Sequence, residues 1–185
     1  MRTKAGLRKE LKNALSSMSD SEHEDISINV SKNLNKLLRS LDVIQKNLVI
    51  GVFAPIEKEP KWFLKLDEEL LKLTAYPAFD KEMVFRLAQL SDLKTKKDFG
   101  VEILGPELAH PIITPNIIIV PGLGFSTDGK RLGRGKGFYD RYLEKSSAIK
   151  IGIAFEMQIK ADIPTDPHDV VMNFVVTDHN VIEIK

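Results

Sequence analysis

The sequence predicts an α/β sandwich, in which helices pack on a mostly parallel β-sheet. Two observations carry this prediction. Short runs that are almost wholly apolar, such as residues 48–53 and 117–120, are typical of strands covered on both faces. Between such runs lie segments whose apolar residues recur at helical spacing. No internal repeat, low-complexity segment or long linker divides the chain, so a single domain over residues 1–185 is expected.

Size and charge limit what such a protein can be. The chain has 185 residues, of which 27 are Lys or Arg and 26 are Asp or Glu, so its net charge is +1. A chain of this length can bury about 70% of its unfolded surface without disulfides, and cysteine is absent. The balanced charge argues against binding of nucleic acid through bulk positive charge. No apolar stretch is long enough to cross a membrane, and we expect a cytoplasmic monomer that binds no membrane.

Two amphipathic helices are predicted at the N-terminal end. The first covers residues 3–17, and its lysines and arginines most simply form a solvated face. Its apolar face is made of Leu7, Leu11, Leu15 and Met18. A Ser with a Glu three places later, Ser19 and Glu22, forms a capping box that starts a second helix running to about residue 40. His23, in the first turn of that helix, is expected to be exposed.

A loop that carries two acids follows the first predicted strand. After residues 48–53 the chain leaves the sheet, and Pro60 is well placed to open a helix. That helix would turn inward Trp62, Phe63, Leu66, Leu70 and Leu71. Ligands of open α/β sheets bind at the carboxyl ends of strands, which is where Glu57 and Glu59 fall. The simplest interpretation of Glu59 is an exposed loop acid.

The rest of the chain supplies further strands and connections. Strands are predicted at residues 73–77, 83–88, 149–155, 172–177 and 181–184. Tyr76 and Phe85 could stack on a flat ligand ring, although strand aromatics usually belong to the core. Residues 91–116 have little periodicity and are interpreted as a long surface connection. Gln158 is expected on the ligand side of the sheet, and His168 is interpreted as a turn residue.

One glycine-rich basic stretch, residues 121–141, is central to the functional prediction: PGLGFSTDGKRLGRGKGFYDR. It follows the apolar run 117–120 and leads into residues 138–143, which are interpreted as a helix. Glycines let backbone N–H groups approach a ligand closely, and the lysines and arginines among them favour an anion. A strand, a basic glycine-rich loop and a helix N-terminus together are typical of a phosphate site. The alternative interpretation is a solvated, flexible hairpin that carries charge.

Two common nucleotide motifs do not explain this stretch. Residues 124–130 satisfy the first seven places of a Walker A loop, but Arg131 stands where a Ser or Thr hydroxyl should bind magnesium. The glycines at positions 133, 135 and 137 lack the spacing of a dinucleotide fingerprint. Directly behind them, Phe138, Tyr139 and Asp140 could serve a flat ring and a metal within one turn of the chain. The sequence therefore favours an anion site of another type.

A longer pattern in this stretch resembles a known family. Residues 120–125 (VPGLGF) and 129–140 (GKRLGRGKGFYD) are similar to the signature of 5-formyltetrahydrofolate cyclo-ligases, also called methenyltetrahydrofolate synthetases. The resemblance extends from Lys4 to about Thr177 and implies a three-layer α/β/α sandwich with a Rossmann-like, mostly parallel sheet that lacks the dinucleotide fingerprint. It also implies a ligase that uses ATP and Mg²⁺ to convert 5-formyltetrahydrofolate to 5,10-methenyltetrahydrofolate. ADP and phosphate would be released, through an iminium phosphate formed on the formyl group.

The same resemblance implies roles for particular residues. Those implied in ATP binding are Lys4, Arg8, Arg131, Leu132, Gly133, Arg134, Gly135, Lys136, Gly137, Phe138 and Tyr139. Those implied in folate binding are Val52, Glu57, Arg134, Lys136 and Phe138, of which Arg134 and Lys136 are also the implied catalytic residues. Asp140 and Asp169 are implied as Mg²⁺ ligands, although from sequence alone each is more often a helix cap or a salt-bridge acid. Phe138 stands where the family often has Tyr, so a ring contact is retained and a role for a hydroxyl is not.

Two other classes of function stay open at this point. The same architecture hosts sugar-phosphate isomerases and CoA transferases, which need no ATP. A non-enzymatic RNA-binding module would use Arg134, Lys136, Phe138 and Tyr139 as a basic stacking surface, although the balanced net charge disfavours it. ATP consumption that depends on added formylfolate would separate the ligase from both.

Overall fold

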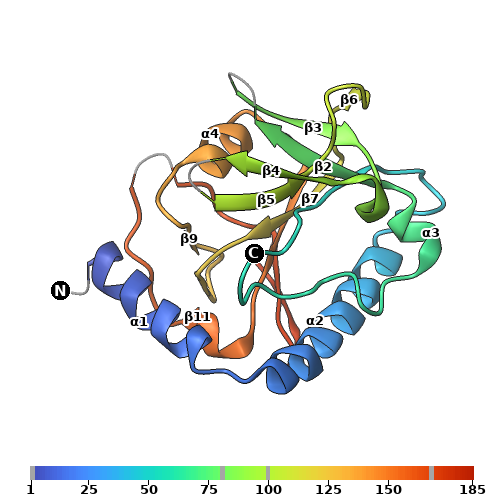
Figure 1. Ribbon diagram of the computed structural model, residues 1–185. Coiled ribbons are helices and arrows are strands. Elements are labelled where there is room, and N and C mark those ends of the chain that lie inside the picture. The colour runs from blue at the N-terminus through green and yellow to red at the C-terminus, as the bar shows by residue number, and fades with distance from the viewer. Residues whose placement is uncertain (1–2, 80–81, 99–100, 167–168) are drawn as a thin grey trace.

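A mostly parallel sheet forms the centre of the computed structural model, which describes residues 3–79, 82–98, 101–166 and 169–185 (Figure 1). Its eight strands lie in the order β13-β12-β10-β7-β1-β2-β3-β6. Their bounds are β1 Ile50–Gly51, β2 Thr74–Phe79, β3 Met83–Leu87, β6 Ile112–Ile113, β7 Ile117–Pro121, β10 Ile149–Ile153, β12 Phe174–Val176 and β13 Val181–Glu183. The central strands from β12 to β2 pair in parallel, and antiparallel pairs occur at both edges. His168, predicted as a turn residue, lies outside the described residues.

Helices cover both faces of this sheet. One face packs against α1 (Lys4–Ser16), α2 (Asp20–Ser40) and α3 (Glu68–Leu71), and the other against α4 (Phe138–Glu144). Along β7, Ile117 belongs to the first core and its neighbour Ile118 to the second, as the two-residue period of a strand requires. Tyr76 and Phe85 are buried, one in each core, so their assignment to the core is confirmed. With α1 and α2 along one side of the strands (Figure 1), the predicted three-layer architecture is confirmed.

Both predicted N-terminal helices form, and each begins after a capping residue. Thr3 caps α1, and Ser19 and Glu22 form the predicted capping box of α2. The prediction that His23 is exposed is wrong: it is 4% exposed, and its ring lies edge-on against Phe155. The loop after β1 covers this turn of α2 and accounts for the burial. None of the described helices is long and apolar enough to cross a membrane.

The helix predicted to open at Pro60 does not form, and the helix α3 begins only at Glu68. The intervening backbone makes only short turn bonds to itself, and its other amides bond to polar side chains of α2. Ser27, Ser31 and Asn35, spaced four apart on one face of α2, accept hydrogen bonds from three of its amides. Ser31 also donates to a carbonyl oxygen of the same segment, that of Trp62. The prediction fails because these bonds depend on a neighbouring helix and not on local propensity.

Residues 91–116 contain a hairpin and not the predicted irregular connection. The strands β4 (Lys94–Asp98) and β5 (Val101–Gly105) pair antiparallel in a two-stranded sheet of their own. The sequence of β4, KTKKD, is wholly polar. Because this pair does not join the central sheet, no alternation of apolar and polar residues marks it in the sequence.

The first half of the glycine-rich stretch forms a third, small sheet. The strand β8 (Gly124–Ser126) pairs with β9 (Arg131–Leu132) on one side and with β11 (Ile159–Lys160) on the other. Phe125 is buried in the core on the α4 side of the central sheet. This half of the stretch is therefore a packed element and not a solvated hairpin. The strands β1 and β10 are shorter than predicted, which lengthens the loops that follow them.

Candidate functional site

The carboxyl ends of three neighbouring strands meet at one edge of the sheet. The strands β10, β7 and β1 are parallel neighbours, so the loop after β1 and the glycine-rich stretch after β7 begin side by side. Val52, a predicted folate contact, is fully buried where β1 ends. Gln158 is also buried, and its amide donates to the carbonyl oxygens of Gly122 and Leu123. It lies at the carboxyl edge of the sheet, as expected, but it is buried there and supports the glycine-rich stretch from inside.

Backbone conformations that favour glycine shape the second half of the stretch. Gly135 and Gly137 have φ angles of 98° and 69°, in the left-handed region where a side chain is strained. Gly137 is the N-cap of α4, so the helix begins directly after the basic residues. A Cβ atom added to Gly135 would lie 3.7 Å from the guanidinium carbon of Arg8. The loop therefore runs alongside α1.

Two cations of α1 reach this loop from far away in the sequence. Nε of Arg8 donates to the carbonyl oxygen of Gly133 at 2.9 Å. Nζ of Lys4 lies 2.6 Å from a carboxylate oxygen of Asp166 and 2.6 Å from one of Asp169. Burial lowers the pKa of Lys4, but the hydrogen bonds and charges of the two acids outweigh it and raise that pKa above its usual value. The structure thus brings Arg8 to the loop with which it was grouped in the sequence, and Lys4 to Asp169, the predicted Mg²⁺ ligand.

Arg131 lies inside the protein and fixes the start of the loop. Its Nη1 donates to the carbonyl oxygen of Pro121 at 3.0 Å, and its Nη2 donates to the carboxylate of Asp140. Its guanidinium carbon lies 5.8 Å from the centre of the Tyr139 ring. The side chain of Leu132 belongs to the core, so its contact with a ligand would have to come from its backbone.

Arg134 joins the glycine-rich loop to the loop after β1. Its Nε lies 3.0 Å from Oε1 of Glu59, and its Nη1 lies 3.3 Å from Oε2 of Glu57. The side chain of Glu59 is 9% exposed, whereas that of Glu57 is 70% exposed. The interpretation of Glu59 as an exposed acid is therefore wrong, because Arg134 and the Ile56 amide bind its carboxylate inside the fold. Burial raises the pKa of Glu59 above its usual value, against the opposing effect of Arg134.

The backbone of Glu57 is itself unusual. Its φ angle is 49°, in the left-handed region that residues other than glycine seldom adopt. Such a conformation costs on the order of 1 kcal/mol or more. Asp42 and Asn47, which lie outside the site, also adopt it. The strain places an exposed carboxylate next to Arg134.

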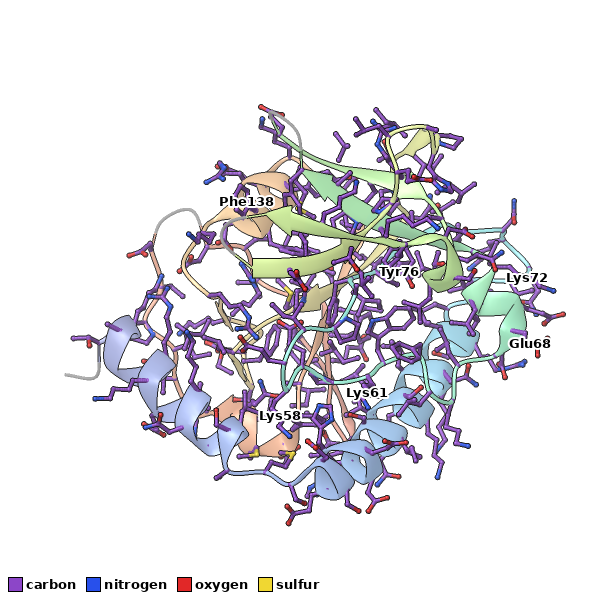
Figure 2. The ribbon with its side chains drawn as sticks, in the orientation of Figure 1. Lys58, Lys61, Glu68, Lys72, Tyr76 and Phe138 are labelled. Atoms are coloured by element: carbon purple, nitrogen blue, oxygen red, sulfur yellow. The ribbon has the colours of Figure 1, made fainter. Side chains whose placement is uncertain are left out.

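The remaining loop residues differ in their surroundings. Lys136 is exposed. The ring of Phe138, which opens α4 (Figure 2), lies 5.1 Å from the ring of Phe79 and 5.1 Å from the guanidinium carbon of Arg141. The Tyr139 hydroxyl is buried and has no hydrogen-bond partner among the residues that the structure describes. Burial raises the pKa of Tyr139, so this hydroxyl stays protonated.

Asp140 and Asp169 line one cavity of about 420 Å³. Its other lining residues are Gly137, Arg141, Glu144 and Asp166. Both carboxylates are bound by cations, Asp140 by Arg131 and Asp169 by Lys4. Burial alone would raise the pKa of Asp169, but hydrogen bonds from Lys4 and the Asp166 amide and the Lys4 charge outweigh it and lower that pKa.

Within the described ranges no three acids or histidines are arranged to hold a metal ion. Two carboxylates beside a phosphate loop still suit Mg²⁺, which prefers few protein ligands and completes its shell with water and phosphate oxygens.

Comparison with known proteins identifies the family. The family model described as "5-formyltetrahydrofolate cyclo-ligase family" matches residues 1–178. The chain belongs to this cyclo-ligase family. This confirms the resemblance that residues 120–140 indicated. The protein is therefore a ligase by family.

Relatives of the cyclo-ligase family match the chain to different extents. A 5-formyltetrahydrofolate cyclo-ligase of Mus musculus is 43% identical over 67 residues, and one of Mycolicibacterium smegmatis is 41% identical over 71 residues. These two matches cover 33% and 37% of this chain and the same shares of the relatives, so they span about a third of each protein. A cyclo-ligase of Mycoplasma pneumoniae is 29% identical over 180 residues, which cover 95% of this chain and 98% of the relative.

Solved structures carry the likeness across the whole fold. A 5,10-methenyltetrahydrofolate synthetase of Aquifex aeolicus superposes with a TM-score of 0.81 at 28% identity, over 98% of this chain and 93% of the other. A synthetase of Mycoplasma pneumoniae superposes with a TM-score of 0.73 at 24% identity, over 96% of this chain and 99% of the other, and shows the shared fold.

Two acids that the structure brings to this candidate site were not predicted from the sequence. Glu59 was interpreted as an exposed acid, and its one signal was its place two residues after Glu57, in a loop at the end of a strand. Asp166 was not singled out, and it shares Lys4 with Asp169. Both acids are recognised only through cations more than seventy residues away along the chain. The roles predicted for the other site residues stay predictions.

Proposed function

We propose that this protein closes 5-formyltetrahydrofolate to 5,10-methenyltetrahydrofolate at the expense of ATP, with release of ADP and phosphate. One observation carries the proposal. Arg134, from the glycine-rich loop, lies within hydrogen-bond reach of Glu57, from the loop after β1. A phosphate held by the first loop and a pterin ring held by the Glu57 carboxylate would therefore meet at Arg134.

The nucleotide would lie along the glycine-rich loop. Its phosphates would accept hydrogen bonds from backbone amides between residues 131 and 139, where Gly135 and Gly137 permit close approach. Lys4 and Arg8, which already contact this part of the fold, would add positive charge from α1. When bound, Mg²⁺ would be held by Asp140 and Asp169 and would neutralise charge on the phosphates.

The folate would bind across from the phosphates. Carboxylate oxygens accept hydrogen bonds from ring amino and amide N–H groups, and the Glu57 carboxylate is exposed for such a contact. Val52 would line the apolar part of the site at the end of β1, and the Phe138 ring would contact the substrate from α4.

The chemistry requires a better leaving group than a formamide oxygen. In the proposed reaction the formyl oxygen attacks the γ-phosphorus of ATP, the bond from that phosphorus to the bridging oxygen breaks, and ADP leaves. The second folate nitrogen then attacks the carbon of the resulting iminium phosphate and loses its proton. The carbon–oxygen bond breaks, and phosphate departs. Arg134 and Lys136 would stabilise the negative charge of the phosphoryl group during transfer and hold it in line.

The test is the spectroscopic appearance of the methenyl product. Purified protein is mixed with 5-formyltetrahydrofolate, ATP and Mg²⁺, and each component is omitted in turn. Product that forms only in the complete mixture, with one ADP released per product, is the expected result. Folate turnover without ATP would overturn the ATP-dependent reaction, and a complete mixture in which no ATP is consumed would favour the isomerase or CoA-transferase alternative, which needs no ATP.

We further propose that residues 1–185 act as one domain, as a monomer and without nucleic acid. A single cooperative unfolding transition tests the first statement. Sedimentation of the purified chain tests the second, because a dimer would sediment as a heavier species. A filter-binding titration with single-stranded RNA at low salt tests the third.

A further inference from the structure

Glu59 stands out because burial of a carboxylate is costly. Among the described residues it is the only acid in the buried class. Removing an ionised carboxylate from water is unfavourable unless good partners replace the water, and even a well-paired buried ion often stabilises a fold less than an apolar residue would. A buried acid beside a predicted catalytic cation therefore needs an explanation other than stability.

The fold fixes Glu59 through its backbone as well as its side chain. Its Oε2 accepts from the Ile56 amide at 3.1 Å, and its Oε1 accepts from Nε of Arg134 at 3.0 Å. Its own amide donates to the Ile56 carbonyl oxygen, and its carbonyl oxygen lies 3.0 Å from Nε2 of the buried His23. The carboxylate therefore sits in a rigid frame made by α2 and the loop after β1.

Arg134 is bound differently by its two acids. Its contact with Glu59 is inside the protein, whereas its contact with Glu57 is longer and reaches an exposed carboxylate. A ligand with N–H groups could replace Arg134 at Glu57, because solvent reaches the Glu57 carboxylate and part of the Arg134 side chain. No ligand could replace it at Glu59 without unpacking the loop. One contact is therefore exchangeable and the other is permanent.

We propose that Glu59 is the positioning residue of Arg134: it holds Nε, so that the terminal nitrogens of the guanidinium point toward Glu57 and the phosphate loop when substrate arrives. This inference rests on the proposed function and extends it. When folate takes over the Glu57 carboxylate, Nη1 of Arg134 is released to the phosphoryl group. The anchor at Glu59 keeps the guanidinium from adopting the many other rotamers that an arginine on a partly exposed loop can reach.

The experiment is a double-mutant cycle on kcat/KM for methenyl formation. It compares wild type, Glu59→Ala, Arg134→Ala and the double variant. The dissociation constant for 5-formyltetrahydrofolate is measured by calorimetry for the same four proteins. A variant whose turnover is too slow to assay then still gives a binding result. Glu59→Gln is added because its amide oxygen can still accept from Nε of Arg134. Asp67→Asn is the control, since it weakens another arginine–carboxylate pair, with Arg39, outside the site.

We expect Glu59→Ala to lower kcat/KM about 100-fold, the usual effect of misplacing a catalytic group by about an ångström. In the Arg134→Ala background the same change should have no further effect, because the group that Glu59 positions is gone. Glu59→Gln should lose less activity than Glu59→Ala. Its amide offers one oxygen where the carboxylate accepts from two donors, so its melting temperature should fall below that of wild type. Asp67→Asn should keep wild-type kcat/KM.

Assay of the wild-type protein distinguishes failure of the proposed function from failure of the positioning role. If wild type forms no methenyl product, the proposed function fails. If wild type is active but Glu59→Ala and Glu59→Gln keep its kcat/KM, or if the losses of Glu59→Ala and Arg134→Ala add, the positioning role alone is overturned. If Glu59→Ala does not fold, Glu59→Leu takes its place in the cycle, because it fills a similar volume but cannot accept from Nε of Arg134, and wild-type kcat/KM in that folded variant overturns the positioning role.

Discussion

Lys136 differs from the other cations of the glycine-rich loop in its surroundings. Arg131 is bound by a carbonyl oxygen and by Asp140, and Arg134 is bound by two acids. The structure gives the Lys136 ammonium no ion pair among the described residues, and its side chain is exposed. A flexible, strongly hydrated point charge of this kind can follow a phosphoryl group as it moves between two oxygens. At the scale of single residues, Lys136 is therefore the clearest candidate for charge stabilisation in the transition state.

Replacing this lysine should separate activity from stability. We expect Lys136→Ala to lower kcat by about 100-fold, a typical loss when one donor to a developing charge is removed. The melting temperature should not change, because the side chain makes no described contact that supports the fold. Lys72→Ala, at an exposed lysine after α3 (Figure 2), is the matched control and should keep full activity. A folded Lys136→Ala protein with wild-type kcat would remove this residue from the mechanism.

Asp140 offers a second prediction at this scale, directed at magnesium. We expect Asp140→Asn to raise the Mg²⁺ concentration for half-maximal activity about tenfold or more, since the amide lacks the charge that binds the cation. The asparagine can still accept the hydrogen bond from Arg131, so the loop should keep its shape. The measurement is a Mg²⁺ titration at saturating ATP. Asp162→Asn, at an exposed acid paired with Lys130, serves as control, and matching titration curves for Asp140→Asn and wild type would exclude Asp140 as a ligand.

At the scale of elements, the sequence predicted best where local signals determine the structure. The capping box of α2 and the apolar stripes of α1 and α2 are complete within those helices, so their bounds were predicted to within a residue or two. Two predictions failed where the partner lies elsewhere. The segment before α3 bonds to serines of α2, and the β4–β5 hairpin forms outside the central sheet with a polar strand. Neither partner can be identified from the spacing of apolar residues.

The bond between α2 and the segment before α3 leads to a stability prediction. Ser31 is fully buried, accepts from the Lys65 amide at 2.8 Å and donates to the Trp62 carbonyl oxygen at 2.6 Å. Ser31→Ala leaves both backbone groups without this partner, so we expect it to lower the free energy of unfolding by about 1–3 kcal/mol. Chemical denaturation measures the effect. Ser40→Ala in the same helix, where the hydroxyl only meets a carbonyl of its own helix, should change little. Equal effects of the two substitutions would contradict the role given to Ser31.

At the scale of the whole molecule, strand order brings the site together. The rule that ligands bind at the carboxyl ends of parallel strands correctly placed the loop after β1 beside the loop after β7. The motif at residues 120–140 supplied the family. What could not be predicted is which charges end inside. Glu59 lies in a loop and His23 in the first turn of a helix, positions that usually face solvent. Only the packing of α2 against the loop after β1 buries them.

His23 connects three parts of the fold and should make its stability depend on pH. Its ring packs edge-on against Phe155, beyond β10, and its Nε2 bonds to the Glu59 carbonyl oxygen in the loop after β1. Burial lowers the pKa of His23 below its usual value of 6.5 and outweighs the bond to the Glu59 carbonyl oxygen, which raises it, while the charges of Lys61 and Lys58 lower it further. The unfolded chain therefore takes up a proton near its usual pKa, while the folded protein does so only at lower pH. Between these two values the unfolded state binds more protons, so stability falls as the pH falls.

The prediction is that wild type loses melting temperature between about pH 7.5 and about pH 5.5 and that His23→Gln loses less over the same range. The glutamine amide can donate to the Glu59 carbonyl oxygen and does not titrate, so any remaining slope belongs to other groups. Glu59 itself acts in the opposite sense, because a carboxyl whose pKa is raised by burial lowers stability as the pH rises through that pKa, and its contribution is common to both proteins. His179→Gln, at an exposed histidine near the C-terminal end, should melt with the same pH dependence as wild type. If His23→Gln shows the same dependence of melting temperature on pH as wild type, protonation of His23 does not affect the stability of the fold.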